Sequence, residues 1–163
     1  MDHSLESRLL AAKQYLHDKY DALNRAWQEA EELVISLNVG REVVIHLYEE
    51  DPGSFGHFHP DREGWNDADS IESGSWTHYL AFTKRLGEWR ICYVSVPTGW
   101  EWNNDYAGEW KPILECSKEI RVDAANDLPK LLLAVIEEVE KIAGEAEDAT
   151  RQLKSAIAPF RVR

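Results

Sequence analysis

The chain has 163 residues, a length that suits one domain of ordinary size with a core of its own. It carries 30 acidic and 18 basic residues, for a formal net charge of -12, which opposes binding to a phosphate backbone because such binding needs a positive field. We therefore expect a single domain over residues 1–163 with no nucleic-acid partner.

The first predicted element is a long helix over residues 4–37. This stretch contains no Pro or Gly, and its apolar residues recur every three or four positions, as in a helix that packs by one face. Gly40 follows it and suits the turn after a helix. The apolar stripe consists of Leu5, Leu9, Ala12, Leu16, Tyr20, Leu23, Trp27, Ala30, Val34 and Leu37.

Strand-like runs occupy the middle of the chain, where β-branched and aromatic residues replace helical spacing. We predict a four-stranded antiparallel meander within residues 42–122, with a tight hairpin turn at residues 85–87 between its second and third strands. The four strands are expected at residues 42–48, 77–84, 88–96 and 111–122, with the last strand shorter than its range. Two long loops, at residues 49–76 and 97–110, leave the same end of such a meander.

A second long helix is predicted at residues 127–158. Pro129 belongs in its first turn and Pro159 ends it. Its apolar residues alternate by four and three, as in a coiled coil, and they are Leu128, Leu132, Val135, Val139, Ile142, Ala146, Ala149, Leu153 and Ala156. The sequence therefore predicts an α+β fold in which two long N- and C-terminal helices flank the sheet and pack as an antiparallel, coiled-coil-like pair.

Several observations bear on the compartment. The N-terminal segment has neither the basic region nor the apolar stretch of a signal peptide, and no run reaches the roughly 20 apolar residues of a membrane span. Cys92 and Cys116 lie far apart in apolar runs, which is typical of reduced core residues. We expect a cytoplasmic protein with no membrane partner.

The two long loops concentrate aromatic and acidic side chains, which supply flat contact area and a negative field. We interpret the chain as a noncatalytic interaction protein that binds another protein or a small ligand, with basic ones favoured. The predicted binding residues are Phe58, Trp65, Trp76, Trp100, Trp102, Asp105, Tyr106 and Trp110. In the competing, structural interpretation these tryptophans cover the flank of helices that outrun the sheet.

A metal site is the second interpretation of the first loop. His57 and His59 are separated by one residue, so both imidazoles can lie on one side of an extended backbone, with Asp61 as a third ligand. A metal-dependent or acid–base hydrolase would use this site. The spacing matches no established metal motif, however, and histidines in a loop need no ligand to explain them. We therefore predict no cofactor.

Acid–base chemistry without a metal has weaker support. His46 and His78 lie on predicted strands near the acidic stretch formed by Glu49, Glu50 and Asp51. Carboxylates are frequent along the whole chain, so their proximity discriminates little, and we assign no catalytic residue. A third interpretation is an acidic mimic or inhibitor that occupies a basic protein site. The alanine-rich end of the second helix allows close approach of another helix, so a homodimer through the helices is a further expectation.

Overall fold

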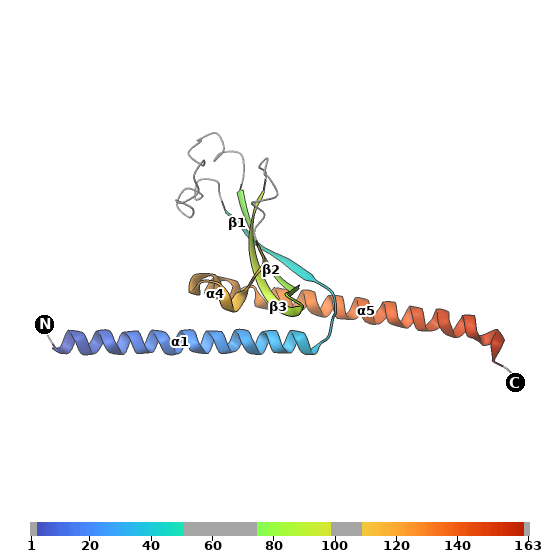
Figure 1. Ribbon diagram of the computed structural model, residues 1–163, viewed down its shortest axis with the longest axis horizontal. Helices are drawn as coiled ribbons and strands as arrows, with labels where there is room; N and C mark the ends of the chain where they lie inside the picture. The colour runs from blue at the N-terminus through green and yellow to red at the C-terminus, as the bar shows by residue number, and fades with distance from the viewer. Residues whose placement is uncertain (1–2, 51–74, 99–108, 162–163) are drawn as a thin grey trace.

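The computed structural model describes residues 3–50, 75–98 and 109–161. A long helix leads into four strands, which are followed by a short helix and a second long helix (Figure 1). The helices are α1 (His3–Ser36), α4 (Lys118–Ala125) and α5 (Leu128–Ile157), and the strands are β1 (Val43–Glu50), β2 (Ser75–Arg85), β3 (Glu88–Thr98) and β4 (Lys111–Pro112). Two single-turn 3-10 helices, η3 (Ile113–Glu115) and η4 (Ala158–Phe160), follow β4 and α5. The predicted α+β class is confirmed.

The four strands form one sheet in the order β1-β2-β3-β4, and every neighbouring pair is antiparallel, as predicted. The turn between β2 and β3 consists of Leu86 and Gly87, whose φ angles of 49° and 89° are both positive. Two successive positive φ angles are the mark of a type I′ turn, whose twist matches that of the flanking strands. The predicted hairpin is therefore confirmed.

The core lies between one face of the sheet and the long helices. Helix α5 packs on β1 and β2, whereas α1 packs on β3, η3 and α4. Trp27 of α1 is buried, and its indole N–H donates a hydrogen bond to the carbonyl oxygen of Arg121 in α4 at 3.1 Å. That bond satisfies the one polar atom of a large apolar side chain. The largest fully buried side chains include Trp27, Val34, Leu80, Phe82, Ile91, Ile113, Leu131 and Val135.

Glu31 joins α1 to the edge of β3. Its carboxylate accepts one hydrogen bond from Nε of Arg90 and one from the backbone N–H of Ile91, both at 2.8 Å, and the residue is 8% exposed. Strand β4 pairs only with Cys92 and Tyr93, so Glu31 occupies the stretch of edge that β4 leaves open. A buried carboxylate is tolerated here because it is both paired and hydrogen-bonded.

The fourth strand is much shorter than the predicted range of residues 111–122, because the chain turns into η3 and α4 directly after Pro112. Ser117 is the N-cap of α4, and its hydroxyl accepts a hydrogen bond from the backbone N–H of Ile120 at 3.3 Å. Serine in this position satisfies one of the N–H groups that a helix start leaves without a partner. The prediction of a strand beyond Pro112 is therefore wrong.

The two long helices run in the same direction. The chain passes through η3 and α4 before α5 begins, and α5 then runs the same way as α1 (Figure 1). The antiparallel pairing predicted for the long helices within one chain is not observed. The C-terminal part of α1 and the N-terminal part of α5 share the core, and the remaining parts project to opposite sides. No helix in the described ranges is long and apolar enough to cross a membrane.

The turn after α1 is tied to α5 by Arg41. Its guanidinium group lies 3.1 Å from Glu138 and 2.5 Å from Glu145. Hydrogen bonding to Arg41 lowers the pKa of Glu145, because the arginine favours the charged form of the carboxyl. Gly40 has a φ angle of 69°, which confirms its predicted place in the turn.

Candidate functional site

Most of the predicted site residues lie outside the described ranges. They are the binding residues Phe58, Trp65, Trp100, Trp102, Asp105 and Tyr106, and the metal-site residues His57, His59 and Asp61. Of the predicted binding residues, Trp76 and Trp110 are described. Among the side chains that the structure describes, no group of three or more His, Cys, Asp or Glu is placed to hold a metal ion.

Trp76 and Trp110 occupy different parts of the molecule. Trp76, near the start of β2, is 4% exposed and pairs with Glu50 and Pro97. Trp110 immediately precedes β4, is partly exposed and lines a pocket beside the turn of the β2–β3 hairpin. At about 3.3 Å per residue, that turn lies roughly 30 Å along β2 from Trp76. The structure therefore brings Trp110, and not Trp76, to this pocket.

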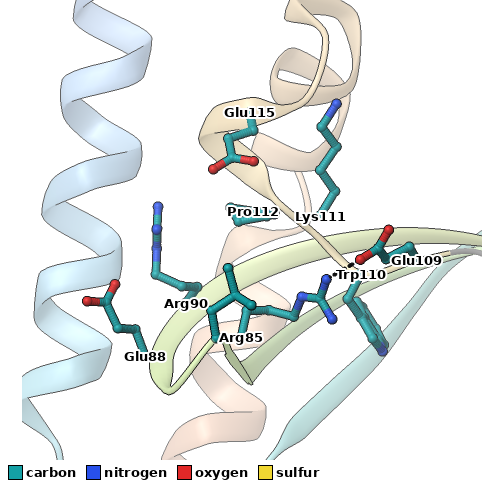
Figure 2. Close-up of a pocket in the computed structure, with 9 residues that line it drawn as sticks. Arg85, Glu88, Arg90, Glu109, Trp110, Lys111, Pro112 and Glu115 are labelled. Atoms are coloured by element: carbon teal, nitrogen blue, oxygen red, sulfur yellow. Dashed lines mark hydrogen bonds and ion pairs between the residues drawn. The ribbon is translucent and has the colours of Figure 1, made fainter.

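The pocket beside the hairpin turn has a volume of about 420 Å³, within the range of small-molecule sites, and carries charges of both signs (Figure 2). Arg85 forms an ion pair of 2.5 Å with Glu109, while Arg90 is held by the carboxylate of Glu31. No ion pair within the described ranges involves Lys111, so its ammonium group can bind an anionic group of a ligand. The lining residues are Arg85, Leu86, Glu88, Arg90, Glu109, Trp110, Lys111, Pro112 and Glu115.

The two strand histidines lie on opposite faces of the sheet. His46 pairs with Tyr79 and His78 pairs with Tyr48, and neighbouring residues of a strand point to opposite faces. His46 is exposed, whereas His78 is buried. They therefore cannot act together on one substrate as an acid–base pair.

His78 is part of an aromatic cluster that spans three strands. Its Nδ1 atom is hydrogen-bonded to the phenol of Tyr93, and the ring of Tyr48 stacks on the imidazole with 4.3 Å between ring centroids. Both His78 and Tyr93 are buried. An imidazole held between two tyrosine rings and shielded from solvent is fixed in orientation, which is typical of a structural histidine.

The long helices present a further surface. We call residues 4–19 the α1 arm and residues 143–157 the α5 arm, because every residue in both ranges is exposed. Large apolar side chains are nevertheless frequent there, namely Leu5, Leu9, Leu10, Tyr15 and Leu16 on the α1 arm and Leu153 and Ile157 on the α5 arm, with Phe160 just beyond it. A row of exposed apolar side chains marks an interaction surface, whereas single ones are ordinary.

Sequence reasoning identified part of these surfaces. Leu5, Leu9, Leu16 and Leu153 belong to the predicted helical stripes, but the stripes were expected to cover one another within the chain. The pocket was missed because Arg85 and residues 109–111 come from two distant segments with no motif-like spacing. The predicted hairpin turn was the one available signal, since it locates Arg85 at the end of a strand.

We compared the chain with known proteins at three levels. No family model matches it, and neither the curated proteins nor the solved structures yield a match.

Proposed function

We propose that this protein acts without catalysis, by binding another protein through its two helical arms. The observation that carries the proposal is the exposure of the apolar stripe beyond the core: Leu9 is 61% exposed and Leu153 is 65% exposed. Each lies on the same helix as fully buried core residues, Trp27 in α1 and Val135 in α5. The stripe thus continues past the region that the sheet covers.

Helix energetics support the same proposal. An isolated helix of about 15 residues is only marginally stable in water, because most helical stability in proteins comes from packing of an apolar face. The α1 arm and the α5 arm have that length, and every residue of both arms is exposed. A protein partner along the stripe would supply the missing packing.

The proposal places the protein in the cytoplasm. Both cysteines, Cys92 and Cys116, are free and buried, as expected for a reducing compartment. The aromatic and acidic loop surface remains a second proposed contact for the same partner or for a small ligand. If this loop surface binds the partner, replacing Trp100 and Trp102 weakens partner capture, whereas replacing His57 and His59 does not.

Affinity capture from cells in which the protein is native tests the role of the arms. The variants Leu9→Glu and Leu153→Glu place a charge within the apolar stripe and are expected to lose the captured proteins. Leu33→Glu and Leu133→Glu are matched controls, since these leucines are 55% and 57% exposed on the same helices but lie off the stripe. Identical capture by all four variants would contradict the proposal.

A further inference from the structure

We infer that the arms bind a second copy of this chain, so that the α1 arm of one protomer lies antiparallel along the α5 arm of its partner. The inference rests on the proposed function and names the partner. The sequence predicts antiparallel pairing of the two long helices. In the inferred dimer this pairing forms between two chains rather than within one. A two-fold axis produces this contact twice, once at each side of the dimer.

The directions of the helices permit this arrangement. Helices α1 and α5 run the same way, and their arms project to opposite sides of the sheet (Figure 1). Rotation by 180° about an axis perpendicular to both helices produces a second copy whose helices run in the opposite direction. The α1 arm of this copy lies on the side of the α5 arm of the first protomer, and its α5 arm lies on the side of the first protomer's α1 arm. Each α1 arm then meets an α5 arm that runs in the opposite direction, and no arm is left over, so the assembly closes at two chains.

The faces of the helices also agree. Leu9 precedes Trp27 by about five full helical turns, and Leu153 follows Val135 by about the same number. Trp27 and Val135 are fully buried in the core, so each arm carries its apolar stripe on the face that the core uses. The contact between arms would extend the core of each protomer along the same line.

The residue sizes are complementary in one antiparallel register. When Ala12 lies opposite Leu153 of the partner subunit, Leu16 lies opposite the partner's Ala149 and Leu9 opposite the partner's Ala156. Large side chains thus face small ones at successive positions, which lets two helices approach closely and interdigitate. Spacings of four and three residues on both helices maintain this register over the arms.

The area is sufficient for a stable dimer. Six large apolar residues on or next to the stripes are between 46% and 81% exposed, and they are Leu5, Leu9, Leu16, Leu153, Ile157 and Phe160. Each leaves on the order of 100 Å² of apolar surface in water, or about 600 Å² per protomer. Two copies would bury up to about 1,200 Å² from these side chains, which reaches the lower limit of a standard interface before the alanines are counted.

Cross-linking between two chains that each carry one added cysteine tests the register. A mixture of Leu16→Cys and Ala149→Cys chains is expected to form a disulfide between chains on mild oxidation, because these positions face each other in the inferred dimer. The matched control is a mixture of Gln14→Cys and Arg151→Cys, which share the register but lie on the opposite helix faces. The native cysteines are buried and do not compete. Equal cross-linking of both mixtures, or stronger cross-linking of Leu16→Cys with itself, would overturn the inference.

Light scattering after size exclusion provides the second measurement. The unmodified protein is expected to have the mass of two chains, and Leu9→Glu or Leu153→Glu should weaken dimerisation by at least about 100-fold, because each charge enters the interface twice. Leu33→Glu and Leu133→Glu should remain dimeric. A monomeric wild-type protein overturns the inference. If that monomer still captures other proteins in an arm-dependent way, the proposed function stands and only the identity of the partner is wrong.

Discussion

Replacing Glu31 with alanine removes the side chain that joins α1 to the edge of β3. The backbone N–H of Ile91 then loses its acceptor in a buried position, which costs about 1–3 kcal/mol. Arg90 loses a charge-assisted hydrogen bond, but 26% of its side chain is exposed, so water recovers much of the roughly 1.5–3 kcal/mol that such a bond contributes. We expect the free energy of unfolding to fall by about 2–4 kcal/mol.

Urea unfolding at one protein concentration, followed by tryptophan fluorescence, measures this change. With an m-value of about 2 kcal/mol per M, the midpoint should fall by about 1–2 M while m stays constant. Glu31→Gln keeps an acceptor for the N–H of Ile91 and loses only the charge, so it should cost about 1 kcal/mol. The exposed neighbour Glu32 is the control, and Glu32→Ala should stay within about 0.5 kcal/mol of the wild type. A similarly small effect of Glu31→Ala would refute the role given to Glu31.

Three further predictions concern other features. Gly144→Ala should raise the free energy of unfolding by about 0.5–1 kcal/mol, since a methyl group there meets open space in a helix. Gly87→Ala should lower the free energy of unfolding by about 1–2 kcal/mol, because Gly87 has a φ of 89°. A change of the same sign in both variants would contradict the turn assignment. Burial raises the pKa of both cysteines to about 11, so at pH 8 about one thiol in a thousand is ionised. A disulfide reagent should therefore react fully with Cys92 and Cys116 only after unfolding. Rapid reaction of the native protein would contradict the burial of the two thiols. Because Arg41 lowers the pKa of Glu145, the stabilisation from this carboxylate is present above its ordinary pKa of 4.5 and is lost as the pH falls through the lowered value. The urea midpoints of wild type and Glu145→Gln should therefore differ above pH 4.5 and converge on further acidification, and a constant difference would contradict the pairing.

Features set by a few neighbouring residues could be predicted from the sequence. Gly87 permits the positive φ of the hairpin turn, and Pro129 lies in the first turn of α5, as predicted. Both long helices begin and end within one residue of their expected limits. Turn and cap chemistry acts over one or two residues, so no knowledge of the tertiary fold is needed to recognise it.

Features set by distant contacts could not be predicted. Leu9 and Trp27 occupy the same stripe of one helix, yet Leu9 is 61% exposed and Trp27 is 1% exposed. The difference arises from where the sheet and α4 cover the helix, which helical periodicity does not record. The helical course of residues 118–125 likewise depends on the cap at Ser117, a short-range signal that the strand-like residues around it concealed. The pocket beside Arg85 has no local signal, because its charged residues meet only when β3 and β4 pair.

The helices also limit how the sheet can grow. Lys130 of α5 donates a hydrogen bond of 2.8 Å to the carbonyl oxygen of His46, next to the bulge in the outer strand β1, while Glu31 of α1 accepts from the N–H of Ile91 at the open part of β3. A foreign strand that added to either edge would first have to displace a charged side chain from the backbone and leave that charge poorly solvated. Templated, fibre-like stacking of sheets is thereby disfavoured at both edges. In the inferred dimer, copies associate through helical surfaces instead, and the assembly closes after two chains.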